Sequence, residues 1–140
     1  MTQPIMVQEA PAEDTLTEIF GEPIYSYTRA QALEDGVLVD VSEMAREAGW
    51  ACPVAVTAAV WALIEDIPPS KRYQDVQGRL WDVLWMGRFK AYLIRRSGVT
   101  QYYYRLILYS GRRKYQVLKV VCGPGDDGEL VVTIMLPHED

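Results

Sequence analysis

The sequence predicts an α+β fold in which N-terminal helices pack on a C-terminal three-stranded antiparallel meander. Helix signals, namely capping residues and apolar runs of helical spacing, are confined to residues before position 97. The last third of the chain is instead rich in tyrosine and β-branched residues, which favour strands. Glycine-containing connections of hairpin length divide this last third into three segments.

The chain of 140 residues, with 49% hydrophobic residues, is long enough to form one domain with a sizeable core. We expect this domain over residues 16–140. Residues 1–15 contain two prolines, little periodicity and an acidic end, so they are predicted to form a flexible tail. Residues 16–27, interrupted by Gly21 and Pro23, are expected to lead into the domain as a loop or short strand.

The first helix is predicted over residues 29–35. Thr28 is followed three residues later by Gln31, which is the capping-box pattern, and Gly36 stands where a helix stop belongs.

A strand and a second short helix follow. Residues 37–41 have strand composition, and Ser42 is predicted to cap a helix over residues 43–48 that ends at Gly49.

Two longer helices are predicted next. Residues 54–67 are mostly apolar and alanine-rich, which favours a buried helix that ends before two prolines. Residues 70–78 are predicted to form a polar loop, and residues 80–96 a helix that Gly87 weakens in its middle.

The three predicted strands are residues 101–109, 115–122 and 130–136. The connection 110–114 contains a glycine and has hairpin length. The connection 123–128 ends in Asp-Gly and is interpreted as a tight turn, because it does not match a calcium-loop template.

Charge is strongly segregated along the chain, although the net charge is only −5. Residues 1–82 hold 14 acidic and 5 basic residues, residues 83–125 hold 9 basic residues and no acid, and residues 126–140 hold 5 acidic residues and no Lys or Arg. Binding depends on local potential rather than on net charge, so the basic block is the most informative feature. The candidate binding residues in this block are Arg95, Arg96, Tyr103, Arg105, Tyr109, Arg112, Arg113 and Lys114.

Alternation along the first strand would place Tyr103, Arg105, Ile107 and Tyr109 on one face. Cationic groups contact phosphates and aromatic rings stack on unpaired bases, which favours a macromolecular contact surface. The main alternative is structural: the tyrosines pack in the core and the charges pair with the acidic N-terminal block. A small anionic ligand is a third interpretation.

Several chemistries have no support in the sequence. His138, near the C-terminal end, is the only histidine, which removes most Ser-His, Cys-His and zinc chemistry. Cys52 and Cys122 are expected to be buried thiols of a reducing compartment. Asp75 and Asp82 flank a helix start and are interpreted as a cap and a solvated residue. We expect no metal, no cofactor and, on balance, no catalysis.

The four tryptophans are predicted to lie mostly in the core, with Trp81 and Trp85 on one helix face because they are four residues apart. An exposed tryptophan would instead mark a protein-binding hot spot. No signal peptide and no apolar run of membrane-spanning length is visible, so we expect a cytoplasmic protein without a membrane partner.

Several segments together resemble a small uncharacterised family that is common on bacterial plasmids and integrative elements. The resemblance covers most of residues 20–140 and rests on residues 20–24, 27–32, 35–41, 78–86, 123–128 and 135–137. It implies a genomic habitat and no catalytic residues. Some small proteins of such elements disable host defences, including CRISPR effectors and restriction enzymes.

Three hypotheses follow for function. The first is a non-catalytic accessory protein of a mobile element that binds a host protein or nucleoprotein complex, as an anti-CRISPR-like or anti-restriction inhibitor. It would use either the acidic block as a nucleic-acid mimic or the basic block as a nucleic-acid contact. The second is a nucleic-acid-binding domain that uses the basic, tyrosine-rich hairpin. The third is an enzyme acting on an anionic, nucleotide-like substrate, whose signature would be a pocket that combines an arginine with a carboxylate of raised pKa.

Overall fold

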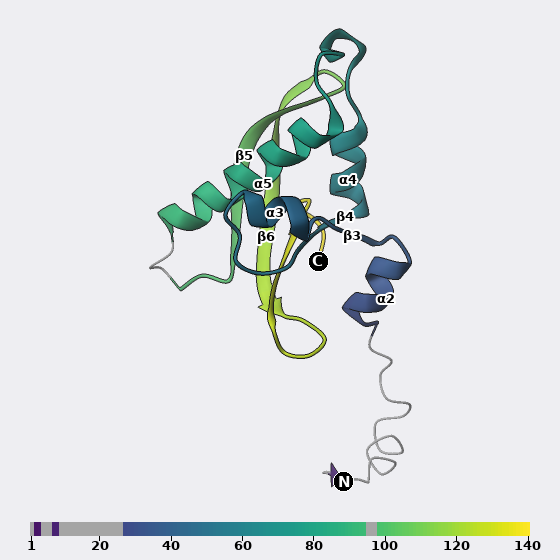
Figure 1. Cartoon of the computed structure of the whole chain (residues 1–140), viewed down its shortest axis with the longest axis vertical. Coiled ribbons are helices and arrows are strands. Elements are labelled where there is room, and N and C mark those ends of the chain that lie inside the picture. Colours follow the sequence, from purple (N-terminus) through teal and green to yellow (C-terminus); the bar gives the residue numbers. More distant parts are fainter. Residues whose placement is uncertain (1, 4–6, 9–26, 95–97) are drawn as a thin grey trace.

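The computed structural model describes residues 2–3, 7–8, 27–94 and 98–140 (Figure 1). Most of the predicted tail, the segment that follows it, and the candidate residues Arg95 and Arg96 lie outside the described residues. Two strands of two residues each, β1 (Thr2–Gln3) and β2 (Val7–Gln8), pair antiparallel near the N-terminus.

The centre of the fold is a five-stranded mixed sheet with the order β3-β4-β7-β6-β5. The three long strands follow one another at the C-terminal end of the chain, and the hairpins between them make β5 antiparallel to β6 and β6 antiparallel to β7. The bounds of the five strands are β3 (Leu38–Asp40), β4 (Val54–Thr57), β5 (Gln101–Ser110), β6 (Arg113–Pro124) and β7 (Leu130–Met135).

The α+β class is confirmed, but the prediction of a three-stranded sheet is incomplete. Strand β4 pairs parallel with β7, with Val54 opposite Val132, and β3 pairs antiparallel with β4 at the edge. The sheet therefore continues beyond the predicted meander into the N-terminal half of the chain.

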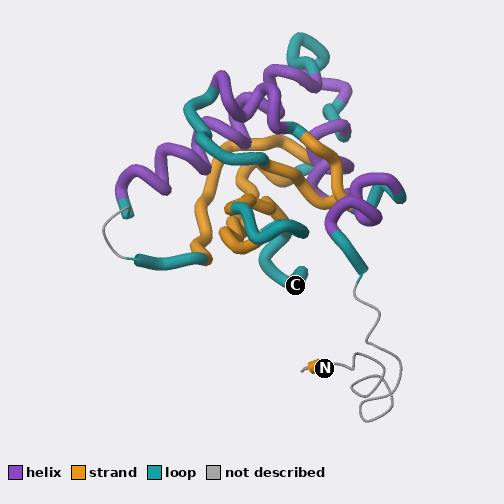
Figure 2. The backbone as a smooth tube through the Cα atoms, turned by 60° about the horizontal axis from the view of Figure 1, so that its bottom comes forward, coloured by secondary structure: helices purple, strands orange, loops and turns teal. Residues whose placement is uncertain are grey.

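Four α-helices and one 3-10 turn complete the described fold. They are α2 (Arg29–Glu34), α3 (Ser42–Glu47), α4 (Ala58–Glu65), η1 (Pro69–Lys71) and α5 (Val76–Leu93). Helices α3, α4 and α5 lie on one side of the sheet, whereas the C-terminal loop lies on the other side (Figure 2). The core lies between the helices and the sheet, where Ile64, Leu84 and Leu118 are fully buried.

The predicted helix over residues 54–67 is wrong in its first four residues. Val54, Ala55, Val56 and Thr57 are all buried and form β4. The helix begins only at Ala58, after Thr57, whose hydroxyl accepts a hydrogen bond from the Val60 N–H at 3.3 Å. A strand covered on both faces lacks the polar alternation that would distinguish it from a buried helix.

The two short predicted helices are confirmed with one correction. The capping box of Thr28 and Gln31 is present at the start of α2. Ser42, however, is the first residue of α3 and does not cap it. Its hydroxyl instead donates to Asp40 Oδ1 at 2.6 Å and accepts from the Val54 N–H at 3.0 Å, so it ties α3 to the start of β4.

Helix α5 begins four residues earlier than predicted. Asp75, interpreted as a cap, accepts a hydrogen bond from the Gly78 N–H at 2.7 Å, so part of the predicted polar loop is helical. Gly87 allows the helix to approach β5 closely, because an added Cβ would lie 3.2 Å from the ring of Tyr104. The Tyr104 hydroxyl donates to the Val83 carbonyl at 2.7 Å, and burial raises its pKa well above the usual value.

Candidate binding surface

The sheet face that points away from helices α3, α4 and α5 carries a continuous row of exposed side chains over β5 and the adjoining part of β6. Strand β5 alternates strictly, with Tyr102, Tyr104, Leu106 and Leu108 buried toward the helices. The intervening side chains, together with those of β6 that lie beside them, are exposed. We call this surface the open half; it consists of Gln101, Tyr103, Arg105, Ile107, Tyr115 and Val117.

Two tyrosine rings and one guanidinium form the centre of the open half. Tyr103 is 47% exposed and Tyr115 is 42% exposed. The Arg105 guanidinium lies 4.3 Å from the centroid of the Tyr115 ring, a cation–π distance that holds both groups on the surface. In the hairpin register Arg105 is opposite Val117 and Ile107 is opposite Tyr115. The predicted face containing Tyr103, Arg105 and Ile107 is therefore present.

Three further cations extend the open half at the turn between β5 and β6. We call Arg112, Arg113 and Lys114 the basic tip, and all three side chains are exposed. The chain reverses at Gly111, whose φ of 60° is readily adopted by glycine. Within the described residues, neither Arg112 nor Arg113 makes a hydrogen bond or ion pair with an acidic side chain. The predicted alternative of internal charge pairing does not hold there.

Tyr109, the remaining candidate, does not share the open half. A register shift between Ile107 and Ser110 interrupts the alternation at this end of β5. The ring of Tyr109 is half-buried, and the Lys71 ammonium lies 4.3 Å from its centroid. The open half instead gains Tyr115 and Val117, which only the register of the hairpin could have identified.

The other half of the same sheet face is covered. Helix α2 contacts β3, and its Arg29 guanidinium reaches β7, where it donates to Thr133 Oγ1 at 2.8 Å and to the Val132 carbonyl at 2.9 Å. The C-terminal residues contact β6 and β4. Lys119 of β6 donates to the Glu139 carbonyl, and Thr57 of β4 donates to the Glu139 carboxylate. We call this region the covered half; its sheet residues are Ala55, Thr57, Lys119, Val131, Thr133 and Met135.

The turn between β6 and β7 fixes the position of α2. Asp126 accepts hydrogen bonds from the N–H groups of Arg29 at 2.8 Å and Ala30 at 3.0 Å. These bonds lower the pKa of the Asp126 carboxyl. The predicted tight turn is confirmed. Its Asp126 also accepts hydrogen bonds from free N–H groups at the start of a helix 97 residues away.

A cavity of about 380 Å³ at the start of α5 is lined by Arg79 and Asp82, and burial raises the Asp82 pKa. Its composition matches the signature of the third hypothesis. Arg79, however, is only 3% exposed and its donors are already engaged. They contact the carbonyls of Ile64, Leu63, Asp66 and Tyr109 and the side chain of Gln74. This guanidinium joins the end of α4 to α5 and β5, and its donors are not directed at a ligand.

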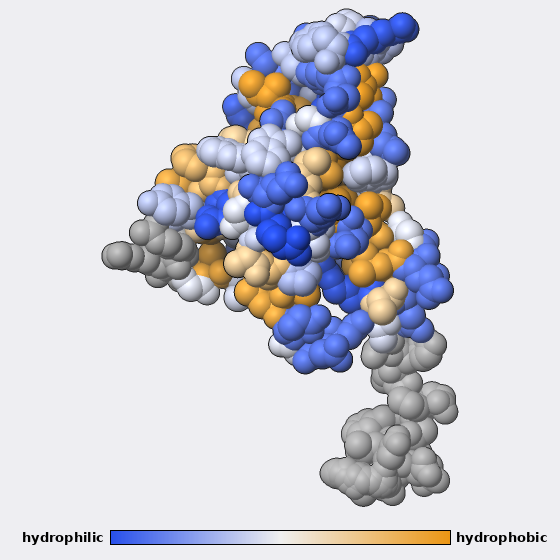
Figure 3. Space-filling model, in the orientation of Figure 1, coloured by the Kyte–Doolittle hydropathy of each residue, from blue (hydrophilic) through white to orange (hydrophobic). Residues whose placement is uncertain are grey.

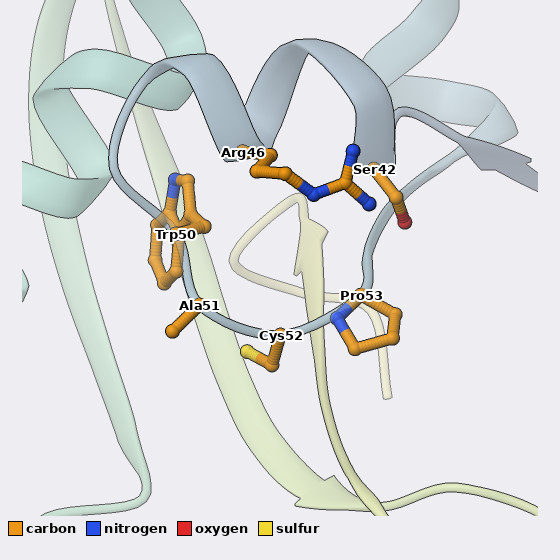
Figure 4. A pocket seen from close by; sticks show the side chains of 6 residues that line it. All are labelled: Ser42, Arg46, Trp50, Ala51, Cys52 and Pro53. Atoms are coloured by element: carbon orange, nitrogen blue, oxygen red, sulfur yellow. The ribbon is translucent and has the colours of Figure 1, made fainter.

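A second cavity, of about 330 Å³, lies beside α3 (Figure 4). It contains the Cys52 thiol and the exposed Arg46 side chain, which extends toward Ser42. Burial raises the pKa of the Cys52 thiol, so the nucleophilic thiolate is disfavoured. Cys52 and Cys122 are both free and half-buried. The cavity therefore lacks an activated nucleophile.

In the part of the chain that the structure describes, no cluster of three or more His, Cys, Asp or Glu side chains is arranged to hold a metal ion. None of the described helices has the length and apolarity needed to cross a membrane.

The fold and this surface define a small α+β protein whose mixed sheet has helices on one face and a half-open, basic and aromatic surface on the other. The chain belongs to DUF6573, a family of unknown function, whose family model matches residues 17–140. The search of curated proteins and the search of solved structures returned no significant match.

Proposed function

We propose that the protein is a non-catalytic binding protein whose open half and basic tip contact the single-stranded nucleic acid of a host nucleoprotein complex. The observation that carries this proposal is the pairing of exposed rings with unpaired cations on one surface. Tyr103 and Tyr115 expose their rings, and Arg105 and the basic tip surround them. Aromatic rings stack on unpaired bases, and guanidinium groups neutralise phosphates.

The absence of competing acids supports this choice of ligand. Residues 83–125, which contain all of the open half and the basic tip, include no Asp or Glu. The side chains that β5 and β6 themselves offer to a phosphate backbone on this surface are therefore cationic, polar or apolar; the nearby carboxylate of Asp66 accepts a hydrogen bond from Ser110 Oγ at 2.8 Å at the end of β5. A single strand fits better than a duplex, because the ring faces of a duplex base pair are already stacked on their neighbours.

The class of target that we propose is a nucleic-acid-handling complex of a bacterial host, such as a CRISPR effector or a restriction enzyme. This class follows from the expectation that the small family which the sequence resembles is common on bacterial plasmids and integrative elements. A protein that occupies the nucleic-acid strand of such a complex would act as an inhibitor without catalysis of its own.

Fluorescence anisotropy with a labelled oligothymidine of about 20 nucleotides tests the binding step. We expect binding that weakens steeply between about 50 and about 200 mM salt, because phosphate contacts release counterions. The double variant Arg112→Glu/Arg113→Glu should lower the affinity by at least about tenfold.

The matched control is Arg46→Glu/Arg72→Glu, which makes the same change in net charge at two exposed arginines outside the surface. Its affinity should stay within about threefold of the wild type, since non-local charge is largely screened at these salt concentrations. Equal losses in the two double variants, or no binding by the wild type at low salt, would contradict the proposal.

A further inference from the structure

Helix α5 has apolar side chains on both of its sides. Leu80, Val83 and Leu84 are buried against the sheet. The opposite side exposes a second stripe, which consists of Trp85, Met86, Phe89, Tyr92 and Leu93. Apolar side chains gather over this helix on the face shown in Figure 3. A helix that is apolar all round is normally covered on all sides, so the α5 stripe indicates an interface.

The stripe is preorganised and rich in the residue types that dominate protein interfaces. The rings of Trp85 and Phe89 are stacked, with centroids 5.5 Å apart and planes 16° apart. Each of these two rings is 44% exposed. The prediction that the tryptophans lie mostly in the core is therefore wrong for Trp85, which stacks on Phe89 rather than remaining in the core. Exposed tryptophan and tyrosine are the typical anchors of binding hot spots.

We propose that the α5 stripe is the interface of a homodimer in which α5 packs antiparallel on α5 of a second copy. The exposed positions lie three and four residues on either side of Phe89. A two-fold axis at Phe89 would therefore pair Trp85 with Leu93 of the other copy, and Met86 with Tyr92. Each contact then occurs twice, as an isologous interface requires. Antiparallel packing also aligns the helix dipoles favourably.

The exposed area is sufficient for such a dimer. Three aromatic side chains of about 200 Å² each, close to half exposed, contribute about 300 Å². Met86 and Leu93 bring the stripe to roughly 500 Å² per copy, so a dimer would bury about 1,000 Å² in total, near the lower bound for a specific interface. We therefore expect a weak dimer with a dissociation constant on the order of 10 μM.

The charges beside the stripe permit this packing. Arg88 lies next to Phe89 in the chain, but its Nε donates to the Gly49 carbonyl at 2.9 Å, which draws the guanidinium toward the loop after α3. Lys90, on the other flank, would lie near Arg88 of the other copy, because the axis at Phe89 relates positions 90 and 88. This like-charge contact is screened by salt, so dimerisation should not weaken at high salt. Nucleic-acid binding by the open half should have the opposite salt dependence.

Sedimentation velocity from about 1 to about 500 μM tests the dimer. The wild type should shift from monomer to dimer over this range, and Phe89→Glu should remain monomeric throughout. The control Tyr73→Glu makes the same charge change at a tyrosine that is 79% exposed in the loop before α5, and it should dimerise like the wild type. Far-ultraviolet circular dichroism confirms that both variants are folded.

Disulfide trapping provides a second, geometric test. A two-fold axis at Phe89 places residue 89 beside residue 89 of the other copy, so oxidised Phe89→Cys should form a covalent dimer. Tyr73→Cys should not, and the wild type shows the background from Cys52 and Cys122. A wild type that stays monomeric at all concentrations, a dimer that survives Phe89→Glu, or no cross-link at position 89 would each overturn the proposal.

Discussion

The two halves of one sheet face differ in the partners of their cationic side chains. In the covered half, the Arg29 guanidinium of α2 donates to Thr133 Oγ1 and the Val132 carbonyl of β7, and Lys119 of β6 donates to the Glu139 carbonyl. In the open half, the Arg105 guanidinium lies over the Tyr115 ring of the same surface, and the side chains of the basic tip are exposed. Charge of the same sign thus stabilises the fold on one side and is available for binding on the other.

This difference bears on the ambiguity of the segregated sequence. A block of 9 basic residues between two acidic blocks permits either internal neutralisation or binding. Among the described residues, Asp75 caps the start of α5 and Asp126 accepts hydrogen bonds from the first N–H groups of α2. In the part of the chain that the structure describes, no acidic side chain forms a hydrogen bond or ion pair with Arg112 or Arg113.

The largest expected loss of stability follows the replacement of Arg79, which is only 3% exposed. Arg79→Met should reduce the free energy of unfolding by at least about 3 kcal/mol, because several buried carbonyls lose their donor at once. Arg112→Met, in the basic tip, should change it by less than about 0.5 kcal/mol. Urea unfolding followed by tryptophan fluorescence measures both. Comparable losses would show that the basic tip is also structural.

A smaller loss of stability is expected when one arginine of the covered half is replaced, and this variant is compared with one of the open half. Arg29→Ala should cost about 2 kcal/mol of stability, because charged hydrogen bonds to Thr133 and to the Val132 carbonyl are lost from a half-buried site. Arg105→Ala should cost about 0.5 kcal/mol or less but should weaken oligothymidine binding several-fold. Urea unfolding should therefore show the larger loss for Arg29→Ala, whereas anisotropy should show the larger loss of affinity for Arg105→Ala. An identical ranking would remove the distinction between the halves.

The smallest effect concerns the turn that positions α2. The folded-state pKa of Asp126 lies below its unfolded value because the Arg29 and Ala30 N–H groups bond its carboxylate. Its contribution to stability is therefore fully present above the unfolded pKa of about 3.9 and is lost as the pH falls through the lower folded pKa. The stability difference between the wild type and Asp126→Asn should be constant above about pH 5 and should shrink at lower pH. A difference that does not change with pH would mean that the charge of Asp126 has no role.

The sequence was sufficient for features whose signals are local. The capping box at Thr28, the hairpins between the three long strands, and the alternation of Tyr103, Arg105 and Ile107 all depend on neighbouring residues or on a period of two. The basic tip was identifiable because the turn at Gly111 and its charges are adjacent in the chain.

Features that depend on distant partners were missed. Strand β4 is buried on both faces by segments far away in the chain, so its four residues resemble the helix that follows them. Asp126 caps α2 from 97 residues away, and Arg79 is held by backbone carbonyls from two separate segments, residues 63–66 and Tyr109. The exposed stripe of α5 could not be predicted, because an apolar helix gives no indication of which of its sides the sheet will cover.

Amide chemical-shift mapping tests the central claim most directly, because it reports both halves of the sheet face in one titration. Oligothymidine added to the ¹⁵N-labelled protein should shift the amides of Tyr103, Arg105 and Tyr115 and of the basic tip. The amides of Arg29 and Thr133 in and beside the covered half should not move. Shifts centred on the covered half, or no shifts at low salt, would contradict the account.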